Sequence, residues 1–133
     1  MRLIIPVFIA LIFASCTTKN ATKKQVKSEN LIEVKHGVYS EWYPGKKQLK
    51  FHGSIDKKGN RDGKWVFYSE NGNEQSITVY NKGMREGFSL VKYPNGAMHY
   101  RGEYRNDKMV GIWTTYDEKG KVINEKDYGF LDE

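Results

Sequence analysis

The sequence predicts an all-β fold, an elongated antiparallel meander of repeated β-hairpins. Three landmarks recur along the chain at a constant spacing of 24. They are a glycine that opens each unit, a turn glycine and a tyrosine: Gly63, Gly87 and Gly111; Gly72, Gly96 and Gly120; Tyr80, Tyr104 and Tyr128. β-Branched and aromatic residues flank each turn glycine, and this is a hairpin signal because Gly and Asn tolerate positive φ. Self-similarity at a fixed period indicates an array in which each unit covers the next.

The alternation of side chains within a unit supports strands rather than helices. In the clearest copy, Trp65 and Phe67 alternate with Val66 and Tyr68, so both faces of the sheet carry large side chains. An even repeat length keeps equivalent residues on one face from copy to copy. We expect a twisted sheet of about eight strands with aromatic ladders along it. No sustained apolar period of 3.6 occurs after Ser15.

Residues 1–15, MRLIIPVFIALIFAS, are predicted to be a signal peptide that forms a helix. The apolar run from Leu3 to Ala14 is shorter than the roughly 20 residues that a membrane-spanning helix needs, and it suits the core of a secretory signal. The only cysteine of the chain, Cys16, follows at once. With a single cysteine, no intramolecular disulfide forms and no cysteine-based zinc site is possible.

The residues before Cys16, Phe13-Ala14-Ser15, resemble the lipobox of bacterial lipoproteins, with Phe13 in place of the usual leucine. The resemblance implies cleavage before Cys16 and attachment of fatty acyl chains such as palmitate. Two or three chains give lasting membrane attachment, because each buried methylene contributes about 0.8 kcal/mol. Thr17, where many inner-membrane lipoproteins have aspartate, implies an exported protein at the outer membrane that faces the periplasm. The alternative is an ordinary signal peptide with a coincidental cysteine.

Residues 16–34 are expected to be a flexible, disordered tether. Lys, Asn, Thr and Ser dominate this stretch, which cannot bury enough apolar surface to offset the entropy of ordering. Its lysines either contact anionic lipid headgroups or are simply solvated. The formal charge of the whole chain is +6, which favours anionic surfaces but says nothing about the fold.

Residues 35–133 form the predicted repeat domain, with copies at about 37–62, 63–86, 87–110 and 111–129. The pattern Gly-x-Trp-x-x-Tyr, Asn-Gly, tyrosine and Lys/Asn-Gly-Lys-x-x-Gly resembles the MORN repeat (membrane occupation and recognition nexus), in the variant form of the bacterial YwqK antitoxin family. Ser89, Lys119 and Asp107 depart from this pattern, where it has tryptophan, turn asparagine and bend glycine. The resemblance implies a hairpin array for protein or membrane contact, with no catalytic residues to carry over.

Motifs that carry catalysis or bind cofactors are missing from the sequence. His36, His52 and His99 lie in different copies, whereas a metal site needs three or four convergent ligands. The glycines match no phosphate or dinucleotide fingerprint, and six of them are expected to be structural turn residues: Gly63, Gly72, Gly87, Gly96, Gly111 and Gly120. The carboxylates fall at turns and strand exteriors, where an open sheet offers no cleft to desolvate one of them. We therefore expect a protein that is not an enzyme, uses no cofactor or metal and, because it is exported, binds no nucleic acid.

The leading functional hypothesis is a membrane-anchored lipoprotein whose repeats bind a protein partner or an envelope component. Rows of Trp and Tyr offer large, rigid contact area. The candidate binding surface consists of seven aromatic residues: Trp42, Trp65, Phe67, Tyr93, Tyr100, Trp113 and Tyr116. The alternative for these rings is that they only pack together to hold a thin sheet. Alternative functions are a YwqK-like antitoxin or immunity protein that neutralises a toxin, and a module that binds anionic lipid directly.

Overall fold

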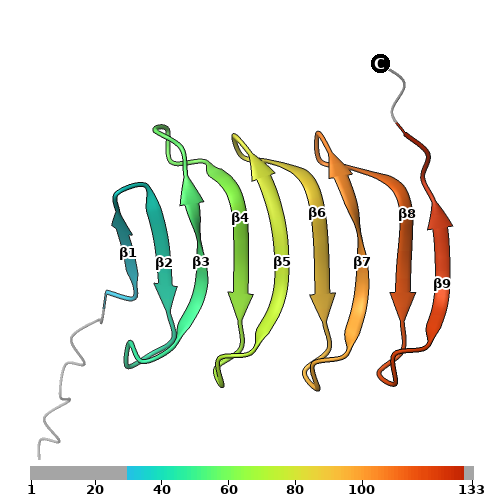
Figure 1. Ribbon diagram of the computed structural model, residues 1–133. Coiled ribbons are helices and arrows are strands. Elements are labelled where there is room, and N and C mark those ends of the chain that lie inside the picture. Colours follow the sequence, from blue (N-terminus) through green and yellow to red (C-terminus); the bar gives the residue numbers. More distant parts are fainter. Residues whose placement is uncertain (1–29, 131–133) are drawn as a thin grey trace, which may run out of the picture.

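The computed structural model describes residues 30–130 as one antiparallel sheet whose nine strands follow one another in chain order (Figure 1). The prediction of an all-β hairpin meander is confirmed. Within these residues, no helix is long and apolar enough to cross a membrane. The signal peptide, Cys16 and most of the predicted tether lie outside the described residues. The strands are β1 Ile32–Lys35, β2 Val38–Trp42, β3 Leu49–Ile55, β4 Arg61–Tyr68, β5 Glu74–Asn81, β6 Met84–Lys92, β7 Met98–Arg105, β8 Lys108–Tyr116 and β9 Val122–Asp127.

Strand β1 is one more element than the sequence analysis expects. It lies mostly inside the segment predicted as a tether, residues 16–34, and pairs with β2 from Ile32 opposite Glu41 to Lys35 opposite Val38. The prediction of disorder up to residue 34 is therefore wrong at its C-terminal end. Ile32 and Val34 alternate with charged residues, which is the period of a strand. The run is only four residues long, so the polar composition before it hid the pattern.

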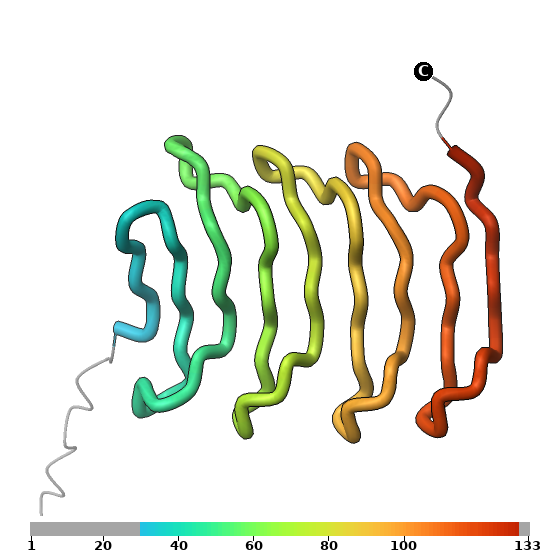
Figure 2. Tube along the Cα trace, in the orientation of Figure 1, coloured from blue at the N-terminus to red at the C-terminus, as the bar shows by residue number. Residues whose placement is uncertain are grey.

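Four hairpins turn at one long side of the sheet, which Figure 2 shows as a row of similar loops. The last three share one hydrogen-bond pattern, and the turn between β2 and β3 is one residue longer. In the turn between β4 and β5, the Ser69 N–H donates to the Asn73 carbonyl and the Gly72 N–H donates to the Ser69 carbonyl. Gly72 has a φ of 87°, which glycine adopts without steric cost. Gly96 and Gly120 occupy the same place in their turns, so these three predicted turn glycines lie in turns.

The other three predicted turn glycines do not lie in turns. Gly63, Gly87 and Gly111 lie inside β4, β6 and β8 with φ of 76°, 101° and 60°. The pairing with the preceding strand shifts register at each of these sites. An extra residue with left-handed φ inside a strand forms a β-bulge, which bends the strand and increases its twist. The repeat period therefore marks bulges as well as turns.

The pairing register separates the residues onto two faces. Tyr39, Gly53, Trp65, Thr78, Ser89 and Gly102 form one cross-strand row, on what we call the tryptophan face. Ser40, His52, Val66, Ile77, Leu90, Arg101, Thr114 and Glu125 form the neighbouring row, on what we call the valine face. The buried hydrophobic side chains are Trp65 and Trp113 on the first face and Val66 and Val110 on the second. The sheet thus buries two hydrophobic side chains on each of its two faces.

Candidate functional site

The two tryptophans at the centre of the predicted binding surface are not available to a partner. Trp65 and Trp113 are each only 5% exposed. Each ring lies flat over a glycine of the preceding strand, Gly53 or Gly102, where a Cβ atom would overlap the ring. Their indole N–H groups donate to the backbone carbonyls of Ser54 and Glu103, at 2.7 and 3.1 Å. The prediction that Trp65 and Trp113 form a binding surface is therefore wrong, because these rings serve the sheet itself.

The remaining predicted rings are half-buried, and Phe67, Tyr93 and Tyr100 pack on other rings of the chain. Phe67 packs on Phe51, with ring centroids 4.9 Å apart, and Tyr100 packs against Trp113 at 5.9 Å. Burial raises the pKa of the Tyr100 phenol. Tyr93 stacks on His99 at 4.3 Å. The two residues left, Trp42 and Tyr116, are half-buried as well.

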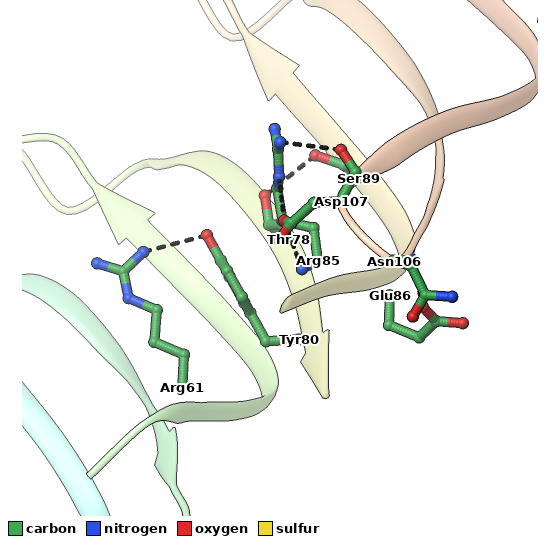
Figure 3. A network of polar contacts seen from close by, with 8 residues as sticks. All are labelled: Arg61, Thr78, Tyr80, Arg85, Glu86, Ser89, Asn106 and Asp107. Carbon is green, nitrogen blue, oxygen red and sulfur yellow. Dashed lines mark hydrogen bonds and ion pairs between the residues drawn. The ribbon is translucent and has the colours of Figure 1, made fainter. Parts of the chain in front are cut away.

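The aromatic packing on the tryptophan face is interrupted in the middle of the array. Between the clusters around Trp65 and Trp113, the row contains Thr78 and Ser89, whose hydroxyl groups lie 3.0 Å apart in a hydrogen bond (Figure 3). Ser89 occupies the place of a tryptophan, and Thr78 occupies the place of the glycine that a tryptophan needs. The loss of tryptophan at Ser89 is thus accompanied by the loss of glycine at Thr78, its partner on the neighbouring strand.

Polar contacts join successive units at the other long side of the sheet (Figure 3). The Arg61 guanidinium donates to the Tyr80 hydroxyl at 3.1 Å and lies over the Trp65 ring at 4.3 Å. One unit later, the backbone N–H and the Nε of Arg85 both donate to the Asp107 carboxylate at 2.9 Å. These two hydrogen bonds, the backbone one first, hold the pKa of Asp107 below its usual range. These contacts hold successive bends together.

A shallow groove on the valine face is the best candidate for a binding site. It has a volume of about 580 Å³ and lies over β6 to β9 at the C-terminal end of the sheet. Phe88, Ile112 and Phe130 line it with apolar surface and are 42%, 62% and 72% exposed. Solvent exposure of large apolar side chains that lie together marks an interaction site more often than single exposed residues do.

Four charged side chains also line this C-terminal groove. Arg101 lies in one cross-strand row with Thr114 and Glu125. Glu103 is opposite Phe88, and Asp127 is opposite Ile112. Glu125 accepts a hydrogen bond from the Thr114 hydroxyl at 3.3 Å. Three carboxylates and one guanidinium therefore line the groove, in a chain whose total charge is +6.

The groove was not expected from the sequence, because rows of Trp and Tyr are the more familiar mark of a contact surface. The residue that directly follows each bulge glycine could have indicated the groove. Lys64, Phe88 and Ile112 occupy this equivalent position in three units, and all three are exposed. A phenylalanine or an isoleucine at a position where another copy has lysine indicates apolar surface that the sheet does not need.

The three histidines are well separated and hold no common site. His52 is within hydrogen-bond distance of the Ser40 hydroxyl at 3.2 Å, and His99 stacks on Tyr93. His36 lies in the turn before β2, with a φ of 51°. Among residues 30–130, no group of three or more His, Cys, Asp or Glu side chains is placed to hold a metal ion.

No protein-family model matches this sequence, and no curated protein matches it either. The resemblance to MORN repeats and to the YwqK family therefore stays a prediction from the motifs. The candidate site rests on the geometry of the sheet alone.

Proposed function

We propose that this protein is a non-enzymatic, membrane-anchored lipoprotein whose β-hairpin array is a docking scaffold for a protein or an envelope component. One observation carries the proposal. A single-layer sheet exposes large apolar side chains together at one end, where Phe88, Ile112 and Phe130 line one groove. Exposed apolar surface costs solubility unless something covers it, so its retention indicates a partner.

The membrane anchor in this proposal is Cys16, because the residues before it, Phe13-Ala14-Ser15, resemble a lipobox. The segment between Cys16 and Ile32, the first residue of β1, runs from Thr17 to Leu31. A chain of this length spans at most about 50 Å, which is enough to hold the sheet clear of the lipid headgroups. The groove is then at the far end of the strand order from the anchor, because β1 and β9 are the two edges of the sheet.

Metabolic labelling tests the anchor. Cells that express the full chain are fed a fatty-acid analogue, and the labelled protein is compared with a Cys16→Ser variant. We expect label on the unmodified protein and its loss in Cys16→Ser, because the thiol that carries the acyl chain is gone. Label that persists in the variant would show that the anchor assignment is wrong.

Site-specific photocrosslinking in intact membranes tests the docking function. A photoreactive phenylalanine analogue replaces Ile112 in the full chain, and the matched control carries it at Lys64, the equivalent position beside the bulge of β4. We expect a discrete protein or glycan adduct from position 112 and none from position 64. Equal adduct formation at both positions, or none at either, would contradict docking at this end. Adducts to lipid alone would favour the lipid-binding alternative.

A further inference from the structure

The outer edge of β9 borders the C-terminal groove. β9 pairs with β8 on one side, and no described strand lies on its other side. Its six residues, Val122–Asp127, are all exposed. The unpaired N–H and C=O groups of such an edge are a template for one more strand. The groove and the edge together therefore offer backbone hydrogen bonds beside apolar side-chain contacts.

The side chains of β9 differ from those of its counterpart inside the array. β5 lies two repeat units earlier and carries Ile77 and Val79 on the valine face, both half-buried within the sheet. β9 carries Glu125 and Asp127 at the equivalent positions. A strand that continued the same array would face two carboxylates instead of two aliphatic groups. The side chains that this edge suits are consequently cationic as well as apolar.

The charges of the groove are not neutralised from within. None of the ion pairs in residues 30–130 includes Glu103, Glu125, Asp127 or Arg101. The Asp127 carboxylate accepts a hydrogen bond from the Gly129 N–H at 2.8 Å, and the Glu125 carboxylate accepts one from the neutral Thr114 hydroxyl. Three carboxylates and one guanidinium leave a local excess of negative charge. Complementary charge on a partner raises its association rate and sets its specificity.

Pairing of two β9 strands about a twofold axis conflicts with these charges. Opposite residues of an antiparallel pair share a face. Pairings centred between Asn124 and Lys126, which use most of both strands, therefore gather Glu125 and Asp127 of both copies in one small patch of the valine face. Like charges across strands are destabilising. The edge thus favours a different strand over its own copy.

We propose that an extended segment of a protein partner, with two Lys or Arg at successive positions of one face and apolar side chains beside them, adds to the outer edge of β9 as a further antiparallel strand. This inference rests on the proposed docking function and specifies its site and partner chemistry. The segment's cations pair with Glu125 and Asp127, and a neighbouring apolar side chain contacts Ile123, which shares the valine face of β9 and is 60% exposed. Backbone hydrogen bonds supply affinity, and the side chains on one face supply specificity.

The test uses the purified full chain in detergent micelles and three fluorescent nonapeptides. The basic peptide is Thr-Ile-Thr-Lys-Thr-Lys-Thr-Val-Thr, whose even positions share one face of a strand, so its two Lys can lie opposite Glu125 and Asp127. The second peptide has Glu at both Lys positions, and the third is the basic peptide with alternate backbone amides methylated. Fluorescence anisotropy measures binding. We expect the basic peptide to bind at least about tenfold more tightly than either of the others, because they lose the charge pairs or the edge hydrogen bonds.

A charge-reversed double variant, Glu125→Lys with Asp127→Lys, locates the site. We expect it to weaken binding of the basic peptide at least about tenfold and to improve binding of the acidic peptide. The matched control is Glu33→Lys in the opposite edge strand β1, which should leave both affinities unchanged. Circular dichroism and the unfolding midpoint of each variant verify that the sheet is retained.

Three results would overturn the inference. One is no measurable binding of the basic peptide up to about 1 mM, a weaker affinity than strand addition with apolar contact should give. Another is an affinity that the double variant leaves unchanged. The third is sedimentation of the protein alone as oligomers that the double variant dissociates, which would make a second copy the occupant. These results do not touch the acyl-labelling and crosslinking tests, so docking by another segment remains separately testable.

Discussion

At the scale of single residues, the sheet is organised by glycines that make room for tryptophans. A Cβ at Gly53 would lie 2.5 Å from the Trp65 ring, and Gly102 makes an equally severe overlap with Trp113. A ring that lies flat over a backbone loses most of its solvent exposure without a second layer of structure. This is how a single sheet buries two indoles to 5% exposure.

The pair Thr78 and Ser89 gives a double-mutant test of this rule. Ser89→Trp alone should be destabilising because the new ring meets the Thr78 side chain, and overpacking of this kind costs about 1–3 kcal/mol. Thr78→Gly combined with Ser89→Trp recreates the arrangement of Gly53 and Trp65. We therefore expect a favourable coupling energy of about 1–3 kcal/mol between the two changes. Urea unfolding of the four proteins measures it.

The control cycle replaces Ser89 with Ala and keeps Thr78→Gly. Alanine brings no ring, so the favourable coupling should disappear. Equal coupling in both cycles would mean that the glycine acts through backbone flexibility and not by making room for the ring.

The sequence revealed the period of the tryptophans but not their burial. Burial depends on a residue of the neighbouring strand, Gly53 for Trp65 and Gly102 for Trp113. The available signal was an isolated glycine inside a predicted strand, which often marks close approach of another group. An aromatic residue is therefore a poor guide to exposure in this sheet unless its cross-strand neighbour is known.

At the scale of the hairpin, a tyrosine hydroxyl connects the first repeat copy to the second, and another connects the third copy to the fourth. Tyr93 donates to the carbonyl of Tyr116 at 2.9 Å, and Tyr43 donates to that of Tyr68 at the same distance. We expect Tyr93→Phe to lower the free energy of unfolding by about 0.5–1.5 kcal/mol, the usual net value of one hydrogen bond. Tyr116→Phe is the matched control, because that residue contributes only its carbonyl. A cost for Tyr116→Phe as large as that for Tyr93→Phe would contradict the assignment.

The bend between β7 and β8 predicts a pH dependence. Asp107 has left-handed φ, as does its neighbour Asn106, and the hydrogen bonds from Arg85 hold its carboxyl pKa below the ordinary value of 3.8. A lowered folded-state pKa gives stability that is complete above the unfolded-state pKa and is lost as the pH falls through the folded-state value. The bend should therefore loosen on acidification below about pH 4.

The variant Asp107→Asn isolates this charge, because asparagine also tolerates left-handed φ. We expect its thermal midpoint to lie below that of the unmodified protein at neutral pH, and the difference to shrink toward zero near about pH 2. Asp62→Asn is the matched control. Asp62 accepts a hydrogen bond from the Lys82 N–H at 3.1 Å and forms no ion pair in the described chain. A midpoint difference for Asp107→Asn that does not change with pH would contradict the role of the charge.

The sequence predicted the hairpins well because their signals are local. A turn glycine flanked by alternating residues specifies its own hairpin, and this is what recurs from unit to unit. The bulges at Gly63, Gly87 and Gly111 were assigned to turns because glycine signals left-handed φ without saying which structure uses it. Strand β1 was missed because four residues are too few for a periodic pattern to outweigh the composition around them.

At the scale of the whole molecule, units with a buried tryptophan alternate with units that have none at the equivalent position. Trp65 and Trp113 lie two units apart, and the intervening unit has Ser89. The hydroxyl donors Tyr43 and Tyr93 lie in the units without a tryptophan beside a bulge glycine. The packing period is therefore two hairpins, or four strands. One sequence cannot readily show this, because it contains only two such periods.

Pairing only between strands that follow one another in the chain determines how the molecule should unfold. Stability in such an array is approximately a sum of unit and neighbour terms, so damage stays local. Trp113→Ala leaves a cavity beside Tyr100 and Tyr104, and truncation of a buried tryptophan costs about 3–5 kcal/mol. We expect amide hydrogen exchange to accelerate in β7, β8 and β9 while β2, β3 and β4 keep their protection. Trp65→Ala is the matched control, and in this variant amide hydrogen exchange should accelerate first in β2 to β5. Uniform acceleration in either variant would instead mean that the sheet unfolds as one cooperative unit, and the C-terminal groove could then not open or reform independently of the rest.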